Sequence, residues 1–323
     1  MNKKLRINKN TSLRNAFKDQ LGLLMGLFAL CLLLSIISPV FLSTRNLFNV
    51  LRQMSINMFL SCGMLLVILV GGIDLSVGSI IAVSGCLVAG FITNLGMNPI
   101  LALVLATLLG IGLGAISALI ISSTNIPSFI ITLAMMNVGR GIARIYTSSK
   151  TITIDNSLFA TLGTAYIGAI PIQVIYIVLV SIITWIILNK TVIGRNIYAT
   201  GGNPIAAKFS GINTKRTVFF VFIYSAILSS FAGIITASRM FAGTSTAGQS
   251  AEMDAIAAVV LGGASMSGGT GNVFGTVIGV ILIAVLSNGL NLVGVDSSWQ
   301  YVAKGIVIII AVVIDYLRKG KNK

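Results

Sequence analysis

The chain has 323 residues, of which 56% are hydrophobic and only 9% are charged. A soluble globular domain has about 25% charged residues. A chain this poor in charge cannot cover a water-facing surface, so its apolar side chains must face lipid. The composition therefore excludes a soluble globular protein.

The net charge of +15 is concentrated in three clusters. Of the 22 Lys and Arg residues, six lie in the first 18 positions, five between Lys190 and Arg216, and four in 318–323. Basic clusters beside long apolar runs mark the cytoplasmic flanks of membrane helices. This pattern argues against nucleic acid as a partner and predicts that all three clusters are cytoplasmic.

Several kinds of chemistry lack the residues they need. The chain has no histidine, which removes imidazole catalysis and the commonest metal ligand. Cys31, Cys62 and Cys86 stand singly in apolar stretches and are expected to pack rather than to form a disulfide or bind a metal. There is no GxxxxGK[ST] loop for ATP. We therefore expect no catalytic residue, metal or cofactor in this chain. A transporter built from it would have to take its energy from another subunit.

Ten apolar runs are candidates for membrane crossing, since a helix needs about 20 apolar residues to span the hydrocarbon core. The first is too long for the apolar core of a signal peptide and no cleavage site follows it, so it should stay as a span. The run 251–264 is the weakest, because it is short and begins with Glu252 and Asp254. The ten runs are 21–41, 54–70, 77–93, 99–122, 126–146, 171–189, 217–238, 251–264, 272–293 and 299–317.

These runs predict an all-α polytopic membrane protein with about ten transmembrane helices, some broken or re-entrant, and with both termini cytoplasmic. Residues 1–20 form a basic cytoplasmic N-terminus and 318–323 a basic tail. Residues 21–317 form one transmembrane domain that includes the cytoplasmic loop 190–216. If 251–264 alone failed to cross the membrane, the basic tail would lie on the outer side. Either 251–264 crosses, therefore, or a second run also fails to cross. The external loops are then 42–53, 94–98, 147–170, 239–250 and 294–298.

The cytoplasmic loop contains a short helix with recognisable ends. Asn203 is a good N-cap, Pro204 suits the first helical position, and Gly211 suits a left-handed residue just past the end. Such a helix is too short to be stable alone in water. Ile205 and Phe209 share one face, which either rests on the protein's own membrane domain or docks into a cytoplasmic partner.

Two glycine-rich segments share the pattern GGxx[LM]SxG, at Gly71–Gly78 and Gly262–Gly269, and form a weak internal repeat. Both follow one apolar run and precede another, which suggests parallel halves with broken helices near a substrate path. Asp74 either caps the following helix or pairs with a cation, and Glu252 and Asp254 suit a helix N-terminus. The structural or gate candidates are Gly71, Gly72, Asp74, Ser76, Glu252, Asp254, Gly262 and Gly263.

Four motifs, taken in order, resemble the ribose-type permease family of bacterial ABC importers: GGIDLSVGS at 71–79, GRNIYATGGNPIAAKFSGIN at 194–213, MDAIAAVVLGGASMSGGTGNVFGT at 253–276 and SNGLNLVGV at 287–295. The resemblance runs from about residue 38 to 315. It implies a bacterial inner-membrane permease for a monosaccharide, ribose first, with other sugars or autoinducer-2 as alternatives.

The same resemblance implies three protein partners. They are a second permease chain in a homodimer, a cytoplasmic ATPase that binds ATP and Mg, and an extracytoplasmic binding protein that delivers the sugar. It also assigns coupling to the ATPase to the short cytoplasmic helix. The coupling candidates are Gly201, Asn203, Pro204, Ile205, Ala206, Phe209 and Gly211.

The solute path is less well defined by the sequence. Relatives commonly carry a glycine-tyrosine-glutamate run where this chain has Gln249–Met253, which leaves the identity of the sugar open. Polar, uncharged side chains within or beside the spans are candidates for lining the path, although each could equally bond helix to helix. They are Asn57, Asn137, Gln249, Asn288 and Asn291. The rival functions are a self-sufficient secondary transporter and a non-transporting scaffold or receptor.

Overall fold

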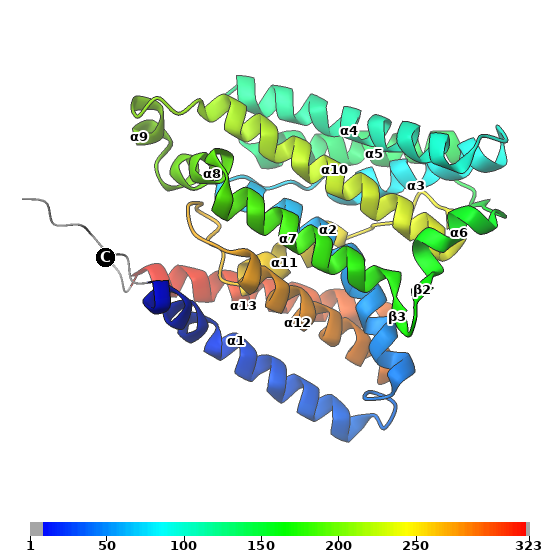
Figure 1. Ribbon diagram of the computed structural model, residues 1–323, viewed down its shortest axis with the longest axis horizontal. Helices are drawn as coiled ribbons and strands as arrows, with labels where there is room; N and C mark the ends of the chain where they lie inside the picture. Colours follow the sequence, from blue (N-terminus) through cyan, green and yellow to red (C-terminus); the bar gives the residue numbers. More distant parts are fainter. Residues whose placement is uncertain (1–8, 321–323) are drawn as a thin grey trace, which may run out of the picture.

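The computed structural model describes residues 9–320, and their side chains from 21 to 310 and at 313. Ten helices correspond to the ten predicted runs, which confirms the all-α polytopic fold (Figure 1). They are α1 (Lys9–Ile37), α2 (Thr44–Leu69), α3 (Val77–Thr93), α4 (Pro99–Ser123), α5 (Ser128–Thr147), α7 (Ile172–Lys190), α10 (Thr214–Met240), α11 (Ala251–Leu261), α12 (Val273–Leu292) and α13 (Ser297–Gly320).

Short elements occupy the two ends of the bundle. Helices α8 (Val192–Gly202) and α9 (Pro204–Phe209) lie at the same end of the bundle as the start of α1 and the end of α13 (Figure 1). This arrangement agrees with the predicted cytoplasmic side. At the other end α6 (Ser157–Thr164) and two-residue strands order the predicted loop 147–170. The strands are β1 (Ile152–Thr153), which pairs with β4 (Ala242–Gly243), and β2 (Tyr166–Ile167), which pairs with β3 (Ile170–Pro171).

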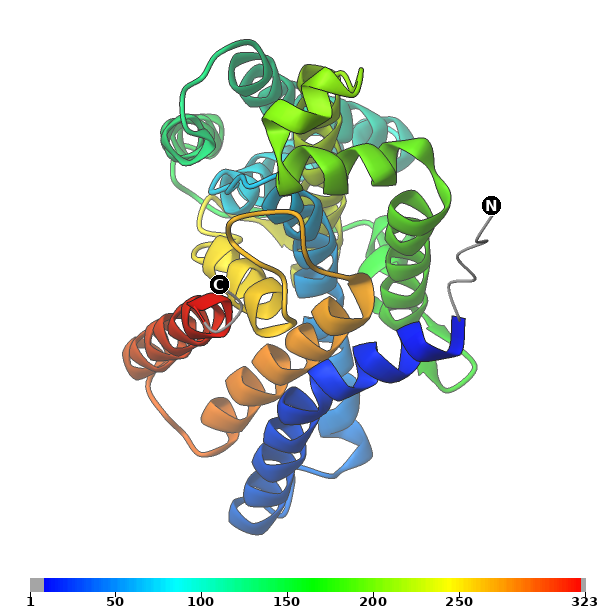
Figure 2. The same ribbon diagram turned by 90° about the vertical axis from the view of Figure 1, so that its left-hand side faces the viewer.

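Helix α2 forms the centre of the bundle. It is mostly buried and packs against α7, α10, α11 and α12, and it runs through the middle of the end-on view in Figure 2. Helices α4 and α7 are the opposite case, since only 33% and 28% of their apolar stretches are buried. Among the described residues, α2, α4, α7, α10 and α12 are long and apolar enough to cross a membrane. The exposed apolar surface is therefore the lipid-facing surface.

Two predicted boundaries were wrong. Helix α2 begins at Thr44, where the Ser43 hydroxyl accepts a hydrogen bond from the N–H of Asn46, so most of the predicted external loop 42–53 is helical. Helix α1 begins at Lys9, inside the predicted basic segment 1–20. Both errors have one cause: apolar composition marks where a helix meets lipid, whereas capping and backbone hydrogen bonds set where it begins. Residues 1–8 and 321–323 of the predicted basic ends lie outside the described residues.

Two largely non-helical segments enter the bundle from opposite ends. Residues 70–76 run inwards from the α8 end to α3, and 241–250 run inwards from the far end to α11 (Figure 1). The 11 residues of α11 extend only about 16 Å, roughly half of the hydrocarbon core. Together 241–250 and α11 make one crossing. The predicted external loop 239–250 was therefore wrong, but the chain still changes sides between α10 and α12 as the sequence predicts. Non-helical backbone at this depth is tolerated because protein surrounds it.

Candidate functional site

The short cytoplasmic helix has the ends that the sequence predicts. The side-chain oxygen of Asn203 accepts hydrogen bonds from the N–H groups of Ile205 (3.0 Å) and Ala206 (2.9 Å), and Pro204 opens α9. Gly211 has φ +82°, a left-handed conformation that glycine adopts at little cost. Local capping chemistry thus fixes both ends of this six-residue helix at the end of the bundle.

Helix α9 presents its large apolar side chains to solvent. Ile205 is 69% exposed and Phe209 is 89% exposed, whereas Ala207 is buried. The alternative in which Ile205 and Phe209 rest on the membrane domain was therefore wrong. Beside α9 lies a groove of about 1120 Å³, which residues 122–125 and 211–215 help to line. An exposed apolar pair above a groove is typical of a surface that a protein partner covers.

Three glycine segments meet behind α9 at backbone contact. The N–H of Gly269 donates to the carbonyl oxygen of Leu69 (2.9 Å), at the end of α2. A Cβ atom on Gly201 would overlap that same carbonyl oxygen. A Cβ atom on Gly268 would lie 2.8 Å from the carbonyl oxygen of Gly201 and 3.0 Å from the N–H nitrogen of Gly71. We call this cluster of Gly71, Gly201, Gly268 and Gly269 the glycine junction. It brings both copies of the predicted repeat against the cytoplasmic loop.

A tyrosine adds a side-chain link to the junction. The Tyr198 hydroxyl in α8 donates to the carbonyl oxygen of Gly271 (2.8 Å) in the loop between α11 and α12. Burial raises the pKa of the Tyr198 phenol, so it remains a protonated donor at neutral pH. Neither Tyr198 nor Gly268 and Gly269 was among the predicted coupling residues. The tyrosine could have been suspected, since it lies within the motif at 194–213.

The buried carboxylate of Asp74 fixes the first non-helical segment. One oxygen accepts from the N–H (3.0 Å) and the hydroxyl (2.6 Å) of Ser76, and the other accepts from the Ser225 hydroxyl (2.8 Å). Ser76, not Asp74, holds the N-cap position of α3, and no cation among the described residues pairs with Asp74. Both predicted roles of Asp74, as the cap of the following helix and as the partner of a cation, were therefore wrong. The Ser76 N–H and hydroxyl instead fix the turn before α3, and the Ser225 hydroxyl joins the segment to the middle of α10.

The two non-helical segments, 70–76 and 241–250, meet where α3 and α11 begin. A Cβ atom on Gly248 would lie 2.7 Å from the carbonyl oxygen of Gly78, so backbone packs directly on backbone. The Glu252 side chain lies against Gly78 and is only 7% exposed. We call this contact of Gly78, Gly248 and Glu252 the helix-end joint. It lies deep in the bundle, between the two non-helical segments.

An arginine that the sequence analysis missed holds the second non-helical segment at this joint. One Arg140 guanidinium nitrogen, from α5, donates to the carbonyl oxygens of Ser245 (2.6 Å) and Ala247 (2.7 Å). These carbonyl groups lie in non-helical backbone, so they need such a donor at membrane depth. The sequence could have indicated this role, because Arg140 is a charged residue within the apolar run 126–146, where a charge is costly unless it has a partner.

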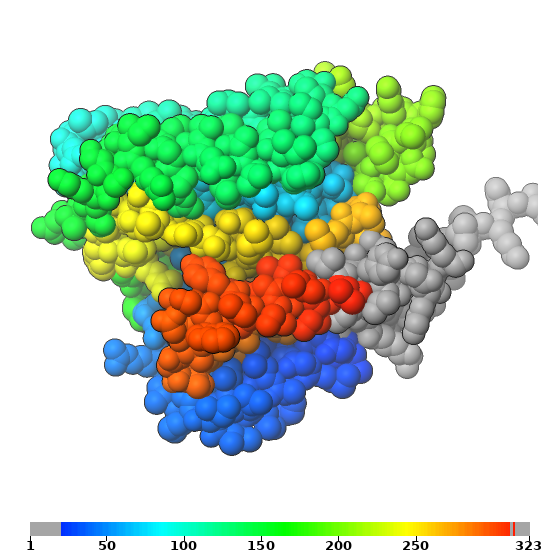
Figure 3. All heavy atoms as spheres, turned by 180° about the vertical axis from the view of Figure 1, so that it is seen from behind, coloured from blue at the N-terminus to red at the C-terminus, as the bar shows by residue number. Residues whose placement is uncertain are grey.

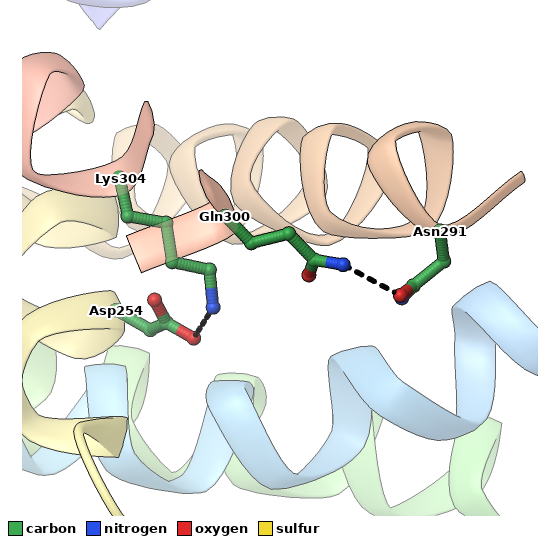
Figure 4. A network of polar contacts seen from close by, with 4 residues as sticks. All are labelled: Asp254, Asn291, Gln300 and Lys304. Carbon is green, nitrogen blue, oxygen red and sulfur yellow. Dashed lines mark hydrogen bonds and ion pairs between the residues drawn. The ribbon is translucent and has the colours of Figure 1, made fainter. Parts of the chain in front are cut away.

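The remaining gate candidates serve packing and pairing. Gly262 ends α11, and Gly263 follows it with φ +89°. In Figure 4 the carboxylate of Asp254 faces Lys304 of α13, with 2.8 Å between the Lys304 nitrogen and the Asp254 oxygen. In the same view the Gln300 amide donates to Asn291 (2.9 Å), at the end of α12. These polar contacts attach α13 to α11 and α12.

The five path candidates lie in different surroundings. Asn288 exchanges two 2.9 Å hydrogen bonds with Asn46, so its amide is used to join α12 to α2. Asn137 is exposed at the middle of α5 and donates only to the Leu133 carbonyl of its own helix (3.1 Å). Gln249 is exposed on the non-helical segment. Asn57 and Asn291 line one cavity of about 460 Å³. The structure brings only these two candidates together.

Three further polar residues, Gln53, Thr236 and Arg239, line that cavity and were not predicted. Gln53 and Arg239 lie in the stretches that the sequence analysis assigned to external loops, where polar residues carry no signal. They join Asn57 and Asn291 only because α2 and α10 extend further than predicted.

Comparisons with known proteins agree with this architecture. A family model described as "Branched-chain amino acid transport system / permease component" matches residues 46–312. The chain is 48% identical over 299 residues to the ribose import permease protein RbsC of Bacillus subtilis, covering 92% of each chain. It is 41% identical over 296 residues to RbsC of Escherichia coli strain K12, covering 90% of this chain and 92% of the relative.

A permease named for another sugar is also similar. The D-allose transport system permease protein AlsC of Escherichia coli is 36% identical over 303 residues, covering 93% of each chain. No solved structure matches the chain. The family match over most of the chain, together with the ten-helix fold and its exposed cytoplasmic helix, shows that this multi-pass inner-membrane protein belongs to the ribose-type permease family of bacterial ABC importers.

Proposed function

We propose that the chain imports ribose, as half of a permease homodimer driven by a cytoplasmic ATPase and supplied by an extracytoplasmic sugar-binding protein. The observation that supports ribose as the sugar is the 48% identity to a ribose import permease over 92% of both chains. Members of this family work with a separate ATPase and binding protein, so ATP and Mg belong to the partner. Residues 21–317 then act as one permease domain, with 190–216 as its coupling loop.

Reconstitution tests this function. The purified chain, its ATPase and its binding protein are placed in proteoliposomes, and uptake of radiolabelled ribose and of allose is measured. Uptake of ribose that needs both ATP and the binding protein is the expected result. Uptake without the ATPase would instead indicate a secondary transporter, and preferred uptake of allose would change the substrate.

Coupling to the ATPase is assigned to α9. Its exposed Phe209 and Ile205 and the adjoining groove of about 1120 Å³ support a docking surface there, and Lys208 and Lys215 give the groove positive charge. Phe209→Asp should release the ATPase during purification, because a charge would replace the apolar contact. Val192→Asp is the matched control, since Val192 is also an exposed apolar residue, at 60% exposure, but lies at the far end of α8. A complex that co-purifies intact with the Phe209 variant argues against docking on α9.

A second copy of the chain is assigned to the face formed by α5, 241–261 and α13, which lie side by side in Figure 3. Asn137 is exposed at the middle of α5, where a polar group facing lipid is costly. Gly141, one turn further along, has open space where a Cβ would be, so another helix could approach closely. Closed twofold dimers are the commonest assemblies of identical chains.

Cysteine cross-linking tests this face. Asn137→Cys should give a disulfide-linked dimer on mild oxidation in membranes, whereas Ile182→Cys on the lipid-facing side of α7 should not. The wild-type chain is the blank, because Cys62 and Cys86 are buried and Cys31 is half-buried. Cross-linking through Ile182→Cys and not through Asn137→Cys would indicate that the dimer contact lies on α7 instead.

A further inference from the structure

A slot between α7 and α10 opens onto the lipid-facing surface of the bundle. Both helices pack against α2, and the space between them is a cavity of about 410 Å³. Each helix turns one stripe of side chains towards it, three or four residues apart, such as Tyr176, Leu179 and Ile183 of α7 and Ile227 and Phe231 of α10. Residues with this spacing share one face of a helix. We call the cavity between these two stripes the α7–α10 slot.

Helix α6 holds α7 and α10 apart at the outer end of the slot. It lies at that end of both helices in Figure 1. The Tyr176 hydroxyl of α7 donates to the carbonyl oxygen of Leu162 in α6 (3.0 Å). The Ser238 hydroxyl of α10 donates to the carbonyl oxygen of Phe159 in α6 (2.7 Å). Because α6 is bonded to both helices, their outer ends do not close on each other.

A hydrogen bond between α7 and α10 closes the other end of the slot. The hydroxyl oxygens of Thr184 and Tyr224 lie 2.8 Å apart. From Tyr176 to Thr184 the slot extends about 12 Å along α7, at about 1.5 Å per residue. One leaflet contributes about 15 Å to the hydrocarbon core. Since α7 begins at the outer side, the slot covers most of the depth of the outer leaflet.

The lining of the slot favours an apolar occupant. The hydroxyl groups of Tyr176 and Tyr224 are both used in the bonds at its two ends. Among the described residues, no charged side chain lines the slot. A buried water needs roughly 2–4 polar partners, whereas an apolar cavity of about 150 Å³ already holds benzene. The slot therefore has room for a longer hydrocarbon and offers little to water.

The surroundings of the slot supply that hydrocarbon. Leu179, Ile183 and Phe231 at its rim are exposed, and the slot is continuous with the largely unburied apolar surfaces of α4 and α7. This side of the bundle faces the viewer in Figure 1, whereas Figure 3 shows the opposite side, to which the second chain is assigned. A lipid tail in the slot touches α7, α10 and Phe59 of α2, so it gains more van der Waals contact than a tail on one open helix face.

We propose that the α7–α10 slot binds one acyl chain of an outer-leaflet phospholipid, which stays with the protein while the surrounding lipid exchanges. The acyl chain fills the space between two helices whose ends are fixed by α6 and by the Thr184–Tyr224 bond. This site goes beyond the proposed function, because it does not depend on which solute the protein carries.

Native mass spectrometry of the complex with its ATPase tests the site. The complex is taken from phosphatidylethanolamine vesicles and washed in detergent until lipid on open surfaces is removed. The wild-type complex should retain one phospholipid per permease chain. Ile227→Trp places an indole in the slot and should lower the retained lipid roughly 10-fold. Ile182→Trp makes the same change on the open lipid-facing side of α7 and should leave the retained lipid unchanged.

Two results of this experiment would overturn the site. One is a washed wild-type complex without phospholipid, which would mean that the slot closes or that another group fills it. The other is equal retention by the Ile227 and Ile182 variants, which would place the bound lipid elsewhere on the surface.

Photo-cross-linking gives a second readout on the unaltered chain, so it does not depend on how a variant folds. Phosphatidylethanolamine with a diazirine in one acyl chain is added to the vesicles, and the complex is washed, irradiated and digested. Adducts should lie on both stripes, at Leu179 of α7 and at Ile227 and Phe231 of α10. Adducts confined to the open side of α7 around Ile182 overturn the proposal, and a protein cross-linked there by a bifunctional reagent in place of lipid would do the same.

Discussion

The hydroxyl of Tyr198 in α8 donates a 2.8 Å hydrogen bond to the carbonyl oxygen of Gly271, 73 residues further along the chain. This bond connects the helix that precedes α9 to the loop that follows α11. If the ATPase docks on α9 as proposed, a movement of α9 would be passed through this bond to α11, the half-helix whose start forms the helix-end joint. In that proposal, the energy of ATP hydrolysis would reach the helix-end joint through this hydrogen bond and the glycine junction.

Removing the Tyr198 hydroxyl should weaken this connection without disturbing packing. Tyr198→Phe deletes one hydrogen bond worth about 1 kcal/mol, and we expect the ratio of ribose taken up to ATP hydrolysed to fall ~5-fold. Tyr301→Phe, at an exposed tyrosine of α13, is the control. Uptake and hydrolysis are measured together in proteoliposomes. An unchanged ratio would show that the bond plays no part in coupling.

The glycine junction permits a comparison between adjacent residues. Gly201→Ala places a methyl group onto the Leu69 carbonyl oxygen, whereas a methyl at Gly202 meets nothing within 4 Å. Overpacking of this kind costs about 1–3 kcal/mol. Gly201→Ala should lower the thermal unfolding temperature of the purified complex and uncouple hydrolysis from uptake, and Gly202→Ala should do neither. Equal behaviour of the two variants contradicts close packing at the junction.

The end of α9 depends on a left-handed residue. Gly211 has φ +82° and open space where a Cβ atom would lie, so a substitution meets strain in the backbone rather than a clash. Gly211→Val should cost ~1–2 kcal/mol at this position and displace α9, which would reduce ATP-coupled uptake. Gly211→Asn should retain most of the uptake, because asparagine tolerates this conformation best after glycine. Equal loss in both variants would mean that the side chain itself obstructs docking.

The pair of Asp254 and Lys304 should hold α13 in place. Lys304→Met leaves the Asp254 carboxylate without its partner inside the protein, at a cost of about 1.5–3 kcal/mol. The double variant Asp254→Asn with Lys304→Met should recover part of that loss, since no unpaired charge remains.

Thermal unfolding of the detergent-solubilised complex measures this effect, with Asp155→Asn, at an exposed carboxylate, as the control. Additive losses in the double variant would show that the two side chains do not interact.

The parts of the fold that depend on local chemistry could be predicted from the sequence. Asn203, Pro204 and Gly211 define α9 through capping and backbone preferences that act over a few residues. The ten apolar runs identify the spans, because the bilayer imposes a length and a composition on each one. The weakness of 251–264 was itself informative, since it corresponds to a half-helix.

The parts that depend on tertiary packing could not be predicted. Residues 239–250 read as an external loop because a polar, glycine-containing stretch does not reveal that Arg140 from another helix satisfies its carbonyl groups. Gly201, Gly268 and Gly71 are far apart in the chain, and their contact requires the path of three segments to be known. Asn57 and Asn288 have the same side chain, yet one faces a cavity and the other pairs with Asn46.

The exposed side chains of Phe209 and Ile205 also have a cellular consequence. A copy of this subunit made in excess of its ATPase displays two uncovered apolar groups on a turn of helix in the cytosol. Such surfaces are what chaperones and membrane proteases recognise in unassembled proteins. The abundance of the transporter in the membrane should therefore follow the supply of the ATPase, with surplus permease degraded rather than stored.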